Sequence, residues 1–172
     1  SVWTKGCTVI FIGVGKKEKL THKVARDTGA KCLAGLSKDL GNEIVIRFTS
    51  GWSTENMTAF AEGMMLRDYE FDKYQKKDEE KNHDDWTLEC QAHERHLEVL
   101  SESIEEASLV TTGVHLSRDL ANEPANRLYP EEFGRRALEW AEGKDNVEVE
   151  VWDYARLQKE GMHGVIAVGK GS

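Results

Sequence analysis

The stretch SRDLANEPANRLYPEEFG, Ser117 to Gly134, holds the only two prolines of this 172-residue chain, Pro124 and Pro130. A helical pattern of apolar residues runs into the stretch, and a second helical pattern begins at Pro130. Pro124 disfavours helical geometry at the preceding Glu123 and removes a backbone donor. Proline is well tolerated, however, at the first position of a helix. The stretch therefore predicts an ordered corner between a long helix and a new structural unit.

Short apolar runs and helical patterns alternate on both sides of this corner. We expect strands where β-branched residues cluster or alternate with polar ones. We expect helices where apolar residues recur every three or four positions behind a capping residue. The predicted strands cover residues 7–14, 43–49, 85–91, 147–152 and 164–168, and the predicted helices cover 19–40, 55–71, 94–120, 131–142 and 153–161. This order predicts an α/β fold with crossover connections.

The composition is typical of a soluble globular protein, with 39% hydrophobic and 31% charged residues. A net charge of −8 gives no support to non-specific nucleic-acid binding, which needs clustered lysine and arginine. The three cysteines, Cys7, Cys32 and Cys90, have no C-x-x-C spacing, and we interpret them as reduced thiols of an intracellular protein. No apolar run is long enough to predict a membrane span.

Two glycine-rich stretches match phosphate-binding loops by letter only. Gly13-Val14-Gly15-Lys16 follows a predicted strand, but the dinucleotide fingerprint needs another glycine at position 18, where this chain has Glu18. In GVIAVGK, residues 164–170, an apolar run stands where a P-loop exposes its amides, and Gly171 replaces the Ser or Thr that would bind magnesium. We interpret the first as a tight turn and reject the second.

Three polar groups could suggest metal binding. The sequence His93-Glu94-Arg95-His96 is one residue shorter than the zinc helix H-E-x-x-H, so its histidines do not have the required i, i+4 spacing. The acidic residues of the polar stretch 72–85 lack the glycine-centred spacing of a calcium loop, and those of the long helix are expected on its solvated side. The acidic residues of the polar stretch are Glu79, Glu80, Asp84 and Asp85, and those of the long helix are Glu102, Glu105 and Glu106. The sequence thus contains no self-sufficient catalytic set.

Four stretches carry a specific pattern along the chain: FIGVGKKEKLT (11–21), AFAEGMMLRDYEFDKY (59–74), SRDLANEPANRLYPEEFGRRA (117–137) and GMHGVIAVGKGS (161–172). In this order and spacing they resemble the cytosolic leucyl aminopeptidase family. The matching features are its Gly-x-Gly-Lys turn, its A-x-G-x-x-L-x-x-Y-x-F-x-x-Y helix, its N-x-P-A-N corner and the strand that opens its catalytic domain. The resemblance covers essentially the whole chain.

This resemblance implies an N-terminal α/β domain at residues 1–92, a three-layer sandwich with a mixed sheet and macro-domain-like topology. It implies a long connecting helix at 93–121 and the start of an incomplete metallopeptidase catalytic domain at 122–172. The whole protein would be a cytoplasmic, hexameric metallo-aminopeptidase acting on peptides with a free N-terminus. Two zinc or manganese ions would activate the attacking water. Targeting to an organelle is not excluded by the sequence, because the chain does not begin with methionine.

The family's metal-binding stretches, of the types V-G-K-G-x-T-F-D-S-G-G and N-T-D-A-E-G-R-L, are not in this sequence. Lys170 lies in a VGKG that mimics the first, but the x-T-F-D continuation is missing. We therefore assign no catalytic, cofactor-binding or metal-binding residue, and expect this segment alone to be inactive. We also expect it to lack the domain's first strands. The alternative is a non-catalytic scaffold or binding subunit that reuses the aminopeptidase fold in a larger assembly.

Overall fold

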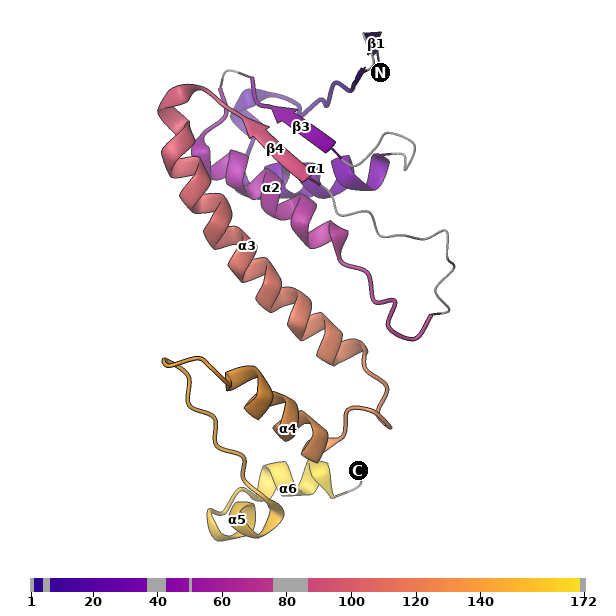
Figure 1. The fold of residues 1–172 in the computed structure, drawn as a ribbon, viewed down its shortest axis with the longest axis vertical. Coiled ribbons are helices and arrows are strands. Elements are labelled where there is room, and N and C mark those ends of the chain that lie inside the picture. Colours follow the sequence, from indigo (N-terminus) through magenta and orange to yellow (C-terminus); the bar gives the residue numbers. More distant parts are fainter. Residues whose placement is uncertain (1, 5–6, 37–42, 50, 76–86, 171–172) are drawn as a thin grey trace. The chain divides into compact units, whose positions relative to one another are not determined.

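A computed structural model describes residues 2–4, 7–36, 43–49, 51–75 and 87–170. The chain forms two compact units, Ser1–Arg118 and Asp119–Ser172, each with its own arrangement of elements. Figure 1 labels these elements along the ribbon. Within the described ranges, no helix is both long enough and apolar enough to cross a membrane.

The first unit combines helices with two small pairs of strands. The antiparallel pair joins β1 to β2 with Val2 opposite Val9, and the parallel pair joins β3 to β4. The elements are β1 (Val2–Thr4), β2 (Cys7–Val9), η1 (Lys17–Lys19), α1 (His22–Gly35), β3 (Glu43–Arg47), α2 (Thr54–Asp68), β4 (Thr87–Gln91) and most of α3 (Glu94–Asn122). The α/β prediction is confirmed.

Side-chain caps fix where α1 and α2 begin. The Thr21 hydroxyl accepts a hydrogen bond from the Val24 amide at 3.3 Å, and the Ser53 hydroxyl accepts one from the Asn56 amide at the same distance. Each bond satisfies a backbone donor that has no partner inside the helix. The predicted cap at position 53 or 54 is therefore Ser53.

The parallel strands β3 and β4 are joined through α2, which provides the crossover that parallel pairing requires. Glu43 lies opposite Thr87 at one end, and Arg47 lies opposite Gln91 at the other. There Arg47 donates from Nε and Nη2 to Gln91 Oε1, at 3.0 and 2.8 Å. The side-chain pair reinforces the register of the two strands.

The core of the first unit lies around α2 and its crossing with α1. A Cβ atom placed on Gly29 would lie 2.0 Å from the carbonyl oxygen of Phe60, and one on Gly63 would lie 2.0 Å from that of Arg26. Backbone therefore packs directly against backbone. The buried apolar residues nearby are Ala25, Met57, Ala59, Phe60, Ala61 and Met64.

The second unit contains α4 (Pro130–Ala141), α5 (Tyr154–Lys159) and α6 (His163–Gly169) after the corner. Pro130 opens α4 as predicted. Asp153 caps α5 by accepting a 2.8 Å hydrogen bond from the Arg156 amide. Gly161 has φ of 72°, a left-handed geometry that suits glycine and ends the α5 turn.

The helix predicted at 19–40 is α1, which ends at Gly35, and residues 37–40 lie outside the described residues. Three predicted strands also differ from the structure. Residues 164–168 lie in α6 rather than in a strand, because a short apolar run fits a helix as well as a strand. Residues 147–152 lie outside any strand ladder. The strand predicted at residues 7–14 ends at Val9 in the structure, and residues 10–14 have no regular structure.

Candidate functional site

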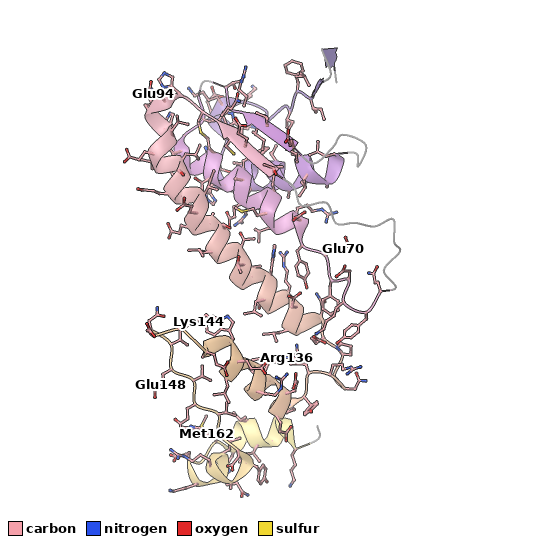
Figure 2. The ribbon with its side chains drawn as sticks, in the orientation of Figure 1. Glu70, Glu94, Arg136, Lys144, Glu148 and Met162 are labelled. Carbon is pink, nitrogen blue, oxygen red and sulfur yellow. The ribbon has the colours of Figure 1, made fainter. Side chains whose placement is uncertain are left out.

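A group of paired charged side chains lies at the proline corner of the second unit. Arg136 donates from Nη1 to Glu123 Oε1 at 2.9 Å and from Nε to Glu132 Oε1 at 2.8 Å. The Glu123 side chain is only 2% exposed, whereas Arg136 remains 26% exposed. Arg136, labelled on α4 in Figure 2, thus ties the residue before Pro124 to the next helix.

Arg135 extends this group along the solvent side of α4. It donates from Nε to Glu132 Oε2 at 2.7 Å and from Nη2 to Glu132 Oε1 at 2.6 Å, and it also pairs with Glu139. The hydrogen bonds from Arg135 and then Arg136 lower the pKa of Glu132 to about 2. A carboxylate with so low a pKa is a poor proton acceptor near neutral pH, so this network acts as an anchor rather than as a general base.

The corner itself is closed by backbone hydrogen bonds. The amides of Arg127 and Leu128 both donate to the carbonyl oxygen of Pro124, at 2.8 and 2.9 Å. The chain therefore turns within a few residues after Asn122, where α3 ends. The corner is ordered, as the sequence predicts.

A second polar cluster joins α3 to the end of α2 in the first unit. Arg118 Nη1 donates to the Leu66 carbonyl oxygen at 2.8 Å, and its guanidinium carbon lies 5.4 Å from the Tyr69 ring centroid. The rings of Tyr69 and His115 are 5.2 Å apart. Within the described part of the chain, His115 Nε2 and the hydroxyl of the buried Thr111 have no hydrogen-bond partner. This cluster holds two helices together and contains no nucleophile–base pair.

The two histidines of the zinc-like stretch make hydrogen bonds at the start of α3. His93 Nδ1 accepts a 3.4 Å hydrogen bond from the Arg95 amide. His96 Nδ1 lies 2.9 Å from the Thr54 hydroxyl, and its Nε2 lies 3.0 Å from Arg95 Nε. Both ring nitrogens of His96 are thus already engaged by protein groups, and the two histidines do not share a ligand position.

The other sequence candidates are also separate from one another. Gly15 has φ of 78° in the irregular segment between β2 and η1, and Lys170 stands at the end of α6. Glu102, Glu105 and Glu106 are exposed on α3, and Glu79, Glu80, Asp84 and Asp85 lie outside the described residues. Among the described side chains, no three from His, Cys, Asp and Glu gather as a metal site.

Two models of one protein family match residues in the two units of the chain. The model of the cytosol aminopeptidase family's N-terminal domain matches residues 6–78, and that of the catalytic domain of the same family matches residues 115–172. The chain belongs to the cytosol aminopeptidase family. The match to its catalytic domain begins within α3, so it includes both the corner and its ion-pair network.

Curated cytosol aminopeptidases align with nearly the whole chain. A probable cytosol aminopeptidase of Clostridium perfringens is 32% identical over 170 residues, which cover 95% of this chain and 34% of that protein. One of Phytoplasma australiense is 34% identical over 167 residues, covering 94% of this chain and 32% of the relative. The chain thus spans about a third of the length of the cytosol aminopeptidases it matches.

Solved structures agree with this family. The bottromycin maturation enzyme BotP matches with a TM-score of 0.74 and 25% identity, covering 94% of this chain and 34% of the BotP chain. A structure of BotP in complex with Mn matches with a TM-score of 0.70 and the same identity. The fold of this chain is therefore similar to a segment of BotP over 94% of the chain.

Sequence reasoning missed the ion-pair network at the corner. The spacing of Glu132 with Arg135 and Arg136, at i+3 and i+4 on a predicted helix, is a readable signal for two of its pairs. The pair of Glu123 with Arg136 spans thirteen positions across the corner. No local pattern identifies that pair, because it depends on the direction in which the chain leaves Pro124.

Proposed function

We propose that this chain supplies the N-terminal domain and the beginning of the catalytic domain of a metal-dependent leucyl aminopeptidase. Such a protein would remove amino acids, leucine among them, from the free N-terminus of peptides. The observation that carries this proposal is the order of the two family matches, N-terminal domain first and catalytic domain second. Both are parts of one family, and α3 runs from the end of the first unit into the second.

The finer assignments extend the same proposal. The N-terminal domain would comprise residues 1–92, the connecting helix 93–121 and the start of the catalytic domain 122–172. The whole protein would be a cytoplasmic homohexamer that uses two divalent ions, zinc or manganese. The description of BotP in complex with Mn supports a divalent metal. The family's metal-binding stretches are not in this sequence, so the ions would be held by other parts of a longer protein.

The role of these residues would be structural. The Arg136 network would fix α4 at the entrance to the catalytic domain. The N-terminal domain would contribute to assembly. We expect residues 1–172 alone to hydrolyse no peptide substrate, because the family's metal-binding stretches are not in this sequence.

The test compares the chain expressed alone with the protein purified from its source. Both are incubated with leucine p-nitroanilide and with a leucine-initiated peptide, after addition of Mn²⁺ or Zn²⁺. We expect hydrolysis only by the source protein, and its loss after treatment with a chelator. Activity of residues 1–172 alone would contradict the assignment of this segment. An inactive source protein that assembles normally would favour the scaffold alternative.

A further inference from the structure

Two buried polar atoms of α3 have no hydrogen-bond partner within the described part of the chain. They are the hydroxyl oxygen of Thr111 and Nε2 of His115. Thr111 is only 3% exposed, so bulk solvent does not solvate its hydroxyl group. Native proteins rarely leave buried polar atoms unpaired, because the lost hydration is then not replaced. The two atoms therefore require a partner small enough to be enclosed with them.

The two side chains are neighbours on α3. Thr111 and His115 stand four positions apart within this helix, which is about one helical turn. Side chains at this spacing lie on the same face, with Cβ atoms about 5–6 Å apart. One small molecule placed between them can therefore contact both polar atoms.

The end of α2 packs against this part of α3. The rings of His115 and Tyr69 have centroids 5.2 Å apart. Arg118, one turn further along α3, donates from Nη1 to the Leu66 carbonyl oxygen at 2.8 Å, and its guanidinium carbon lies 5.4 Å from the Tyr69 ring centroid. Both unpaired atoms are already enclosed by this chain, so their partner must fit inside the existing packing.

Water has the chemistry that this pair of atoms requires. A hydroxyl group both donates and accepts, and Nε2 of a neutral histidine donates in one tautomer and accepts in the other. Water also donates and accepts, so it satisfies the pair in either tautomer. A cation is a poor alternative because the Arg118 guanidinium lies against the same Tyr69 ring as His115. A buried anion would need a paired positive charge, and Arg118 Nη1 already donates to the Leu66 carbonyl oxygen.

We propose that one buried water molecule bridges Thr111 Oγ1 and His115 Nε2 and forms part of the contact between α3 and the end of α2. Buried waters typically make two to four hydrogen bonds to groups that have no other partner, and these two side chains supply the minimum. Both residues belong to the first unit. The water site is therefore independent of the proposed hydrolysis of peptides.

A crystal structure of the source protein, at a resolution that shows ordered water, tests the site directly. We expect an electron-density peak about 2.7–3.2 Å from both Thr111 Oγ1 and His115 Nε2. A direct hydrogen bond between the two side chains, or no peak beside them, overturns the proposal. So does an anomalous peak at this position after bromide is added, because it would identify an anion.

Two conservative variants of the recombinant source protein measure whether the atoms share one partner. Thr111→Val and His115→Phe each remove one polar group and keep an apolar body of similar shape. Each single variant breaks the bridge and leaves the other group without it, so we expect amide exchange of residues 108–118 to become at least about 5-fold faster. The double variant should be closer to the wild type than the sum of the two effects, because no polar group is then left unpaired.

The opposite sign would contradict the bridge. If the hydroxyl group of Thr111 had no partner in solution, Thr111→Val would remove an unpaired buried group and slow the exchange. Thr112→Val is the matched control, because Thr112 is exposed and its hydroxyl group donates to the Ser108 carbonyl oxygen of the same helix. This control should change the exchange little. Equal effects of the two Thr→Val variants, or independent effects of Thr111→Val and His115→Phe, would also overturn the proposal.

Discussion

Arg136 Nη1 lies 2.9 Å from Oε1 of Glu123, and the two residues stand on opposite sides of Pro124 and of the turn that follows it. The carboxylate is almost fully withdrawn from water, and the guanidinium compensates its charge. This ion pair holds the two sides of the proline turn together. It connects the end of α3 to α4 within the second unit.

Replacing Arg136 should therefore be more damaging than replacing its neighbour. Arg136→Met leaves Glu123 charged and without its guanidinium partner, whereas Arg135→Met removes contacts only with the more accessible Glu132 and Glu139. We expect faster amide exchange throughout α4 in the first variant and little change in the second. Equal effects of the two substitutions would mean that the buried pair does not stabilise the corner.

The crossing of α1 and α2 gives a prediction for stability. Gly63→Ala would place a methyl group 2.0 Å from the Arg26 carbonyl oxygen, so the helices must separate. We expect a loss of at least about 2 kcal/mol in the free energy of unfolding, measured with urea. Gly113→Ala is the control, because a Cβ placed there would have no described atom within 4 Å outside the neighbouring residues and local backbone of α3. It should stabilise by about 0.5–1 kcal/mol, and a similar loss in both variants would contradict the close crossing.

The acid titration of Glu132 follows from its two arginine partners. Their hydrogen bonds lower its pKa from 4.5 to about 2 in the folded protein. Because the folded pKa is below the unfolded one, the stabilisation is complete above pH 4.5 and is lost as the pH falls toward 2. Carbon-13 NMR of the Glu132 carboxyl group should report the low pKa. In Arg135→Met it should rise toward 4.5, and an unchanged titration would rule out this cause.

The contacts of Arg118 with the end of α2 should stabilise the folded protein. Arg118→Met removes the hydrogen bond to the Leu66 carbonyl oxygen and the cation–π contact with Tyr69. We expect a loss of about 1.5–3 kcal/mol in the free energy of unfolding, the range for hydrogen bonds to charged groups. Arg118→Lys, which can donate but cannot stack as a plane, should fall between the wild type and the Met variant. An unfolding free energy equal to that of the wild type in Arg118→Met would show that this contact is not needed.

The sequence was most informative where local chemistry decides the structure. Ser53, Pro130 and Asp153 predicted the starts of three helices because caps and prolines act within one turn. It was least informative for GVIAVGK, where a short apolar run does not distinguish a helix from a strand. Residues 147–152 have the alternation of a strand, but alternation specifies a face and not a partner.

Long-range contacts explain the remaining differences. Gly29 counts against a helix by propensity, yet it lies where α1 meets the α2 backbone, so packing outweighs propensity there. The Glu123–Arg136 pair likewise depends on the path of the chain beyond the corner. That the chain contains no catalytic residue remains a prediction. It includes residues 76–86, which lie outside the described residues.

The intact mass of the protein purified from its source decides whether residues 1–172 act within a longer aminopeptidase. We expect a mass well above the 19.4 kDa of this chain, with peptides of residues 1–172 found inside the longer sequence. A mass near 19.4 kDa would contradict it and would leave binding or scaffolding as the work of this chain.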